Sequence, residues 1–171
     1  MPNVEALAML SDAGKDRVPR CIVDQYSVSR WRVTLTHVTC CCGQLSLTFS
    51  QPPVTQLVCH CQDCREVTQQ PTTLVAFFKS EPEGMAGQVI NKPYMGGSGR
   101  PKSYAACAQC GDFLYADVSV LKGLVGVIGD KILPPFRAKP TAHVWTCQRV
   151  VEITDSLPQF PKAPAVRPGA G

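Results

Sequence analysis

The sequence predicts a mainly β domain with short helical turns. Apolar and polar residues alternate in several short segments, and this period of two is typical of a half-buried strand. Proline pairs and glycine-containing stretches lie between the segments, where they end strands because proline cannot donate to a β-ladder. Cysteines gather in close pairs and one triplet, which indicates that metal binding helps to organise the domain.

The expected strands follow from this alternation. Trp31, Val33 and Leu35 share one face of a first strand over 31–36. The same period predicts a second strand over 44–49, with Cys40 to Gly43 as the hairpin corner between the two. The continuous apolar run 74–78 predicts a strand buried on both faces. Further strands are expected at 118–121, 124–128, 142–146 and 150–153.

Other segments are expected to form helices or loops. Residues 4–10 predict a short helix, and 65–70 a single helical turn that ends before Pro71. Residues 81–101 are rich in proline and glycine. We expect a connecting loop there, with a lid over a site as the alternative.

Length and composition favour one domain. A chain of 171 residues that is 44% hydrophobic can bury one substantial core. We expect an N-terminal extension over 1–30, one zinc-binding domain over 31–162, and a flexible tail over 163–171, which is rich in proline and alanine.

Charge and hydrophobicity limit the kinds of binding partner that are expected for this chain. The net charge of +4 is spread along the chain without a block of Lys and Arg, so no nucleic-acid partner is expected. No run approaches the roughly 20 apolar residues of a membrane span, and the first residues lack the basic start of a signal peptide. We therefore expect a cytoplasmic protein that acts on a small molecule.

The cysteine spacing points to metal ligation. Cys-x-Cys and Cys-x-x-Cys pairs would close small, strained disulfide rings, and without a secretion signal metal binding is the better account. Two short-spaced pairs supply the four ligands of a closed structural zinc site. These pairs are Cys40 with Cys42 and Cys107 with Cys110.

This assignment leaves three thiols, Cys59, Cys61 and Cys64. Three protein ligands and an open fourth position are typical of a catalytic zinc. The alternative is that a fourth ligand closes the site, and the candidates are Cys41, His37, His143 and Cys147. Cys21, Cys41 and Cys147 are otherwise expected to be unmetallated, since single buried cysteines behave as small apolar residues.

Residues beside the three thiols have supporting roles. His60 lies between two of the predicted ligands and would point away from their metal in an extended segment. We expect it to form a hydrogen bond behind the ligands or to lie at the surface. Asp63 and Arg65 flank Cys64 and can hold this loop by hydrogen bonds.

Three motifs carry a resemblance to a known family: Cys40-x-Cys42-Gly43, Cys59-His60-Cys61-x-x-Cys64-Arg65 and Cys107-x-x-Cys110-Gly111. This pattern resembles the glutathione-dependent formaldehyde-activating enzyme family, which also contains centromere protein V. The resemblance implies a β-tent fold of twisted antiparallel sheets around zinc. It also implies a structural zinc on Cys40, Cys42, Cys107 and Cys110, and a more labile, functional zinc on Cys59, Cys61 and Cys64.

The resemblance implies a zinc-dependent carbon–sulfur lyase, which condenses glutathione with formaldehyde or cleaves the adduct. Glutathione is then a possible co-substrate, and a related small electrophile can replace formaldehyde. The sequence departs from the family pattern at Thr68-Gln69-Gln70 and at the displaced Arg100 and Tyr104. These positions lie in loops that are expected to line the substrate entrance.

Two alternatives follow. The same zinc scaffold can catalyse elimination, decarboxylation or rearrangement of a specialised metabolite, in a pocket lined by aromatic residues: Phe77, Phe78, Tyr94, Tyr104 and Trp145. A non-catalytic interaction module is the second alternative. It would favour a long basic extension, whereas residues 1–30 contain only Lys15, Arg17, Arg20 and Arg30 as basic groups.

Overall fold

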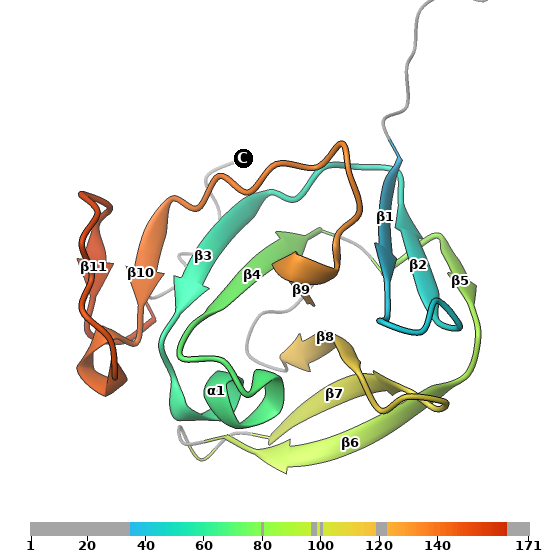
Figure 1. Ribbon diagram of the computed structural model, residues 1–171, viewed down its shortest axis with the longest axis horizontal. Coiled ribbons are helices and arrows are strands. Elements are labelled where there is room, and N and C mark those ends of the chain that lie inside the picture. Colours follow the sequence, from blue (N-terminus) through green and yellow to red (C-terminus); the bar gives the residue numbers. More distant parts are fainter. Residues whose placement is uncertain (1–34, 80, 97–98, 100, 119–122, 164–171) are drawn as a thin grey trace, which may run out of the picture. The chain divides into compact units, whose positions relative to one another are not determined.

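The computed structural model describes residues 35–163, apart from 80, 97–98, 100 and 119–122. In this part the chain is mainly β, as predicted, and its strands form two sheets (Figure 1). The expected helix at 4–10, the extension over 1–30 and tail residues 164–171 lie outside the described residues. The proposed domain boundaries therefore stay a prediction.

The smaller sheet is antiparallel and has the order β1-β2-β5. Its strands are β1 (Thr36–Thr39), β2 (Ser46–Phe49) and β5 (Gly84–Ala86). β1 and β2 form the predicted hairpin, which turns at Gly43 with a φ of 73°. Glycine adopts this left-handed conformation without steric cost, and the turn keeps Cys40 and Cys42 close together.

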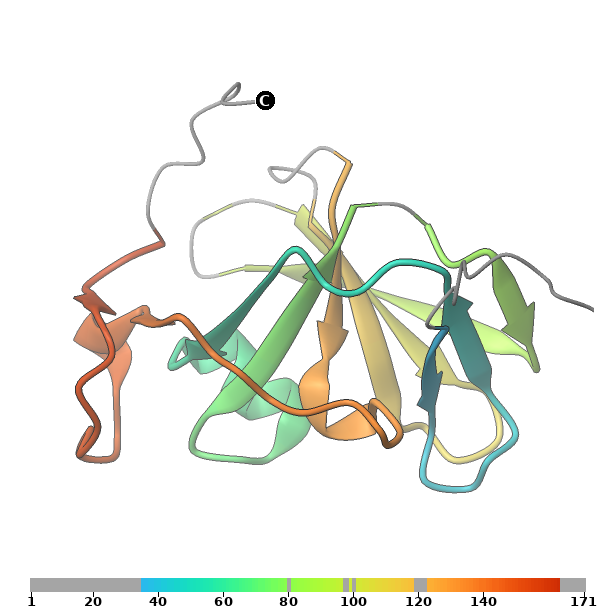
Figure 2. The same ribbon diagram turned by 90° about the horizontal axis from the view of Figure 1, so that it is seen from above.

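The larger sheet has the order β11-β10-β3-β4-β9-β8-β7-β6 in the described part of the chain. Its strands are β3 (Thr55–Cys59), β4 (Thr73–Phe78), β6 (Val89–Met95), β7 (Pro101–Cys107), β8 (Phe113–Val118), β9 (Val125–Ile128), β10 (Ala142–Val144) and β11 (Gln159–Phe160). β10 runs parallel to β3 and to β11. Seen from above, the central strands fan apart, as expected for a strongly twisted sheet (Figure 2).

The helical elements are short. They are α1 (Gln62–Thr68) and the 3₁₀ turns η1 (Gly129–Lys131) and η2 (Thr146–Gln148). None of the helices found among the described residues has the length and apolar character needed to cross a membrane.

The two faces of the larger sheet have different neighbours. On one face Ala76, Phe78 and Val127 pack into the hydrophobic core. There Phe78 stacks on Phe49 of β2, with ring centroids 4.0 Å apart. Residues of the opposite face, which include Phe77 and Val75 of β4, line a cavity. The sheet therefore separates the core from the cavity.

Several predicted strands are confirmed. β2 lies within 44–49 and buries Leu47 and Phe49, and Leu45 directly before it is also buried. β9 coincides with 124–128 except for the first residue. β10 begins at Ala142 as expected and ends at Val144, because the next residues form η2.

The first strand begins later than predicted. β1 starts at Thr36, and Leu35 precedes it and is 45% exposed. Thr36 and Val38 are buried instead, because they continue the alternation that leads to Cys40 at the hairpin corner. Residues 31–34 lie outside the described part.

Two further elements form where they were expected but differ in detail: β4 in its burial and α1 in its first residue. β4 forms at the predicted run and buries Ala76 and Phe78, but Val75 and Phe77 are only half-buried because their face borders the cavity. The helical turn expected at 65–70 is α1, which begins at Gln62 because Cys61 caps it. The side chain of Cys61 accepts a hydrogen bond from the Cys64 backbone N–H, which satisfies one of the free donors of the first turn.

The segment 81–101 is not a connecting loop, since β5, β6 and the first residue of β7 occupy much of it. Pro93 is accommodated in β6 because this strand lies at the edge of the sheet. β3 and most of β8 were not predicted, and of 118–121 only Val118 is described. No strand forms at 150–153, where Val150 is 62% exposed.

Candidate metal centres and adjoining cavity

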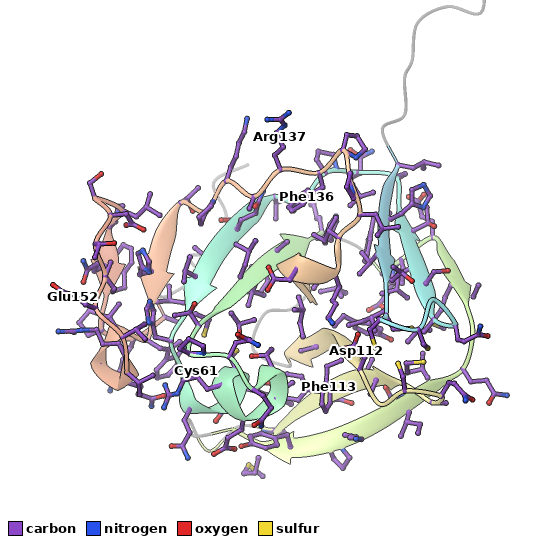
Figure 3. All side chains as sticks on the ribbon, in the orientation of Figure 1. Cys61, Asp112, Phe113, Phe136, Arg137 and Glu152 are labelled. Carbon is purple, nitrogen blue, oxygen red and sulfur yellow. The ribbon has the colours of Figure 1, made fainter. Side chains whose placement is uncertain are left out.

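The described part of the chain contains two groups of cysteines whose sulfur atoms lie within 4.8 Å of one another. The four-thiol cluster consists of Cys40, Cys42, Cys107 and Cys110, and the three-thiol cluster of Cys59, Cys61 and Cys64. In Figure 3 sulfur atoms gather near Asp112 and near Cys61, at two separate places in the domain. The structure thus groups the cysteines as the sequence spacing suggested.

Two tight turns build the four-thiol cluster. Cys40 and Cys42 lie at the β1–β2 turn, and Cys107 ends β7. Gly111 has a φ of 73° and its N–H donates to the Cys107 carbonyl at 2.8 Å, which brings Cys110 back beside Cys107. The Cys40 and Cys42 sulfurs are 3.4 Å apart, and those of Cys42 and Cys107 are 3.8 Å apart.

Asp112 connects the elements around the four-thiol cluster. Its carboxylate accepts a hydrogen bond from the Cys41 backbone N–H at 2.8 Å and one from Lys131 Nζ at 2.7 Å. Burial alone would raise the Asp112 pKa, but these donors lower it overall. The two turns are therefore held together by polar contacts as well as by their position in the sheets.

The three-thiol cluster lies where β3 passes into α1. Cys59 ends β3, Cys61 caps α1, and Cys64 follows within the first turn of that helix. The Cys59 and Cys61 sulfurs are 3.3 Å apart. Among the described residues no fourth Cys, His, Asp or Glu joins this group. His37, His143, Cys41 and Cys147, the suggested closing ligands, are not part of it.

The three thiols share negative charge unevenly. Hydrogen bonds from Cys59 and then Cys64 lower the Cys61 pKa, with further help from the Cys64 N–H and the charge of Lys102. The hydrogen bond to Cys61 raises the pKa of Cys59, and contacts with Cys59 and Cys61 raise that of Cys64. A divalent cation would allow all three to be thiolates, because it offsets their mutual repulsion.

Arg65 fixes the loop that carries the three thiols. Its Nη1 donates to the carbonyl of His60 at 2.5 Å and to that of Gln148 at 2.7 Å. Gln148 belongs to η2 and its side chain also accepts from the Gln62 N–H at 2.9 Å. The expectation that Arg65 holds this loop by hydrogen bonds is confirmed.

His60 is buried behind the thiols, with 1% of its surface exposed. Its Nε2 lies 2.9 Å from Nδ1 of His143, whose Nε2 is 3.1 Å from both carboxylate oxygens of Asp155. Since a carboxylate only accepts, His143 donates from Nε2, and when its ring is neutral its Nδ1 accepts a hydrogen bond from His60. His60 therefore forms the expected hydrogen bond away from the thiols, and its Nδ1 is left without a partner in the described structure.

A cavity of about 240 Å³ adjoins the three-thiol cluster. All three thiols line it, and none of the four-thiol cluster does. Its other walls are mostly apolar and come from the sheet, α1 and the segment after β10: Thr55, Leu57, Val67, Thr68, Thr73, Val75, Phe77, Lys102, Tyr104, Ala116, Leu124, Gly126, Ile128, Val144, Trp145 and Ala163. The three-thiol cluster is thus accessible to a small molecule.

The aromatic lining was predicted in part. Phe77, Tyr104 and Trp145 line the cavity, whereas Phe78 packs in the core and Tyr94 donates to Glu66. Lys102 was not predicted, because it stands in a segment that reads as a loop. Gly126 and Ala116 were also not predicted as cavity residues, because a glycine or alanine in a strand has no functional group that indicates a binding site.

These features define a β domain with two cysteine clusters suited to metal ions, one of which opens on a cavity. A family model described as glutathione-dependent formaldehyde-activating enzyme matches residues 35–148. The chain belongs to this family. No curated protein matches the chain.

Proposed function

We propose that the protein is a zinc-dependent enzyme of carbon–sulfur lyase type, which forms or cleaves adducts of a small thiol and an aldehyde. Family membership supports this activity class. The observation that carries the proposal is that the three-thiol cluster, which has no fourth ligand among the described residues, lines the cavity. The proposed partner is a small-molecule substrate, with glutathione as a candidate thiol.

Both clusters have a donor set that fits zinc. Four sulfurs at about 2.3 Å from a tetrahedral zinc lie roughly 3.8 Å apart, and the measured separations of 3.3–3.8 Å are close to this value. The four-thiol cluster would hold a closed, structural ion through Cys40, Cys42, Cys107 and Cys110. The other cluster would hold an ion through Cys59, Cys61 and Cys64, and such an ion lowers thiol pKa values and acts as a Lewis acid.

Lys102 and Tyr104 are placed to assist the substrate oxygen. Both line the cavity. The Lys102 ammonium is paired with Asp63, and its positive charge acts on Cys61. Burial, followed by the nearby thiols, raises the pKa of Tyr104, so its phenol stays protonated and can donate a hydrogen bond.

The chemistry balances without an oxidant. In the condensing direction a sulfur electron pair forms the C–S bond to the aldehyde carbon, and the C=O π pair moves to oxygen. That oxygen then takes the proton that the thiol has released. Donors such as Lys102 and Tyr104 stabilise the negative charge that develops on it. In the reverse direction the C–S bond breaks and thiol and aldehyde are released.

The experiment combines metal content with turnover. Zinc is counted per chain by elemental analysis, and adduct formation from glutathione and aldehydes is followed by NMR against the spontaneous reaction. We expect about two zinc ions in the wild type, and about one in Cys64→Ser together with a loss of rate. Cys147→Ser is the matched control, since Cys147 is an exposed free cysteine outside both clusters.

One tightly bound zinc in the wild type and no rate above the spontaneous reaction would contradict the proposal. A Cys64→Ser protein that keeps full activity would also contradict it, because the three-thiol cluster would then not be the reacting centre.

A further inference from the structure

We propose that the cavity receives an apolar, aliphatic or aromatic side chain carried by the aldehyde half of the substrate. This inference rests on the proposed function, because it names the electrophile that the same site would use. It excludes formaldehyde as the preferred substrate, since formaldehyde has no side chain to occupy the cavity.

The shape of the cavity follows from one row of residues across the sheet. Phe77 of β4 pairs with Gly126 of β9, Gly126 with Ala116 of β8, and Ala116 with Tyr104 of β7. All four line the cavity. Two small residues between two aromatic ones leave room above the sheet, and the aromatic rings close the row at both ends.

Gly126 is required for this space. A Cβ atom there would lie 3.3 Å from Phe77 Cε1 and 3.3 Å from Val75 Cγ1, closer than ordinary packing allows. A glycine within a strand weakens the sheet and often marks a place where another group approaches closely. Here the groups that approach are the side chains of Phe77 and Val75, and the missing side chain of Gly126 leaves the space between them to the cavity.

The charge of the lining favours an apolar ligand. Apart from the three thiols, Lys102 is the one charged side chain among the described lining residues, and it is already paired with Asp63. Glutathione carries two carboxylates and an ammonium group, which the cavity walls could not pair, so the cavity suits the aldehyde half of the adduct and not the body of glutathione. An apolar cavity of about 150 Å³ is enough for benzene, so about 240 Å³ accommodates a substituted ring or a short alkyl chain.

Lys102 and the thiols orient the ligand. With the carbonyl carbon near Cys61 and Cys64 and its oxygen toward Lys102, the side chain of the aldehyde would extend over Gly126 and Ala116. A carboxylate group resembles the aldehyde carbonyl in shape but does not react with a thiol. Straight-chain alkanoates are therefore suitable probes of the cavity.

The test measures affinity along a series of butanoate, hexanoate and octanoate. The chain has two tryptophans, and Trp31→Phe leaves Trp145, which lines the cavity, as the fluorescent reporter. All members share the carboxylate, so differences report the alkyl chain alone. We expect the Kd to fall about fourfold for each added methylene until the cavity is filled.

Gly126→Val should remove this dependence. We expect its Kd for octanoate to rise at least about tenfold while that for butanoate changes little, because a valine side chain replaces the last methylenes of the ligand. Gly84→Val is the matched control: it lies outside the cavity on β5, and its Cβ would come no closer than 3.6 Å to Thr48. If Gly126→Val does not fold, Ala116→Leu serves in the same row.

Equal affinity along the series in the wild type, or unchanged octanoate binding in Gly126→Val, would overturn the inference. A chain-length dependence without any thiol–aldehyde turnover upholds the ligand class and refutes the lyase function. Turnover of glutathione and formaldehyde, together with an equal Kd for all three alkanoates, supports the lyase function and refutes the ligand class.

Discussion

Arg65 offers the sharpest test of how the three-thiol cluster is held in place. We predict that Arg65→Met strongly destabilises the protein, because the carbonyls of His60 and Gln148 lose their guanidinium donor. A hydrogen bond to a charged group contributes about 1.5–3 kcal/mol. Since a single nitrogen serves both carbonyls, the expected loss is about 2–4 kcal/mol in the free energy of unfolding.

This free energy converts into a measurable change in melting temperature. For roughly 130 residues with an unfolding entropy near 2.1 cal/mol/K per residue, each kcal/mol lowers Tm by about 4 °C. Arg65→Met should therefore melt about 7–15 °C below the wild type in differential scanning calorimetry. Loss of a group that orients a ligand loop should also weaken zinc binding about 10–100-fold in a chelator competition.

Arg149→Met is the matched control. Arg149 is exposed, follows η2 and donates to the Thr146 carbonyl at 3.2 Å, so its loss should lower Tm by no more than about 4 °C. An equal fall in Tm in the two variants would refute the reasoning, because the hydrogen bonds of Arg65 to the thiol loop would then contribute no more to stability than the bond of Arg149. Arg65→Lys should fall between, since an ammonium can satisfy one carbonyl but lacks the planar fork.

Two further predictions concern β6 and the turn that precedes it. The hydrogen bond from Tyr94 to Glu66 raises the Tyr94 pKa to about 12; its contribution to stability is thus present below about pH 10 and lost as pH rises toward 12. In an NMR titration at pH 10.5 the Tyr94 ring should remain protonated, and in Glu66→Gln its pKa should be lower, so that a larger fraction of the ring is ionised at the same pH. Gly87→Ala should unfold the protein at ordinary temperature in circular dichroism, because φ is +96° and the added Cβ would lie 2.0 Å from the Gln44 carbonyl oxygen; a native spectrum and unchanged Tm would contradict this.

The close pairs and the triplet of cysteines were predictable because each is a local signal, whereas the meeting of Cys40 and Cys42 with Cys107 and Cys110 followed from counting the ligands that a closed site needs. Cys59, Cys61 and Cys64 are close together in the sequence. Gly43 and Gly111, which adopt a positive φ, directly follow Cys42 and Cys110, so these two turns are also predictable from neighbouring residues. The strands with clean alternation, β2 and β9, were predictable for the same reason. In both cases the information is contained in a few consecutive positions.

The missed strands depend on distant partners. β6 contains Pro93 and three exposed polar or proline positions in a row, so it reads as a loop until its edge position in the sheet is known. β3 has intermediate burial at Thr55 to Val58 and shows no clear period. Conversely, residues 150–153, which are apolar except for Glu152, resemble a strand but find no partner strand in the described structure.

The cavity as a whole could not be predicted from the sequence, because its lining depends on how the strands pair with one another. Phe77, Gly126, Ala116 and Tyr104 come from four strands and become neighbours only through their pairing. Lys102 reaches the thiols from β7, which is distant in sequence. No window of the sequence contains these residues together.

The register of β3 also decides which thiols face a substrate. Thr55 pairs with Phe77, Leu57 with Val75, and Cys59 with Thr73, and these six side chains all line the cavity. A shift of one residue would turn every side chain of β3 to the opposite face. Cys59 would then point toward the core, as Cys40 and Cys107 do. We infer that the two clusters differ in role because of their surroundings. The register of β3 gives the three-thiol cluster contact with the cavity, whereas the four-thiol cluster packs Cys40 and Cys107 in the core and leaves Cys42 and Cys110 at the surface.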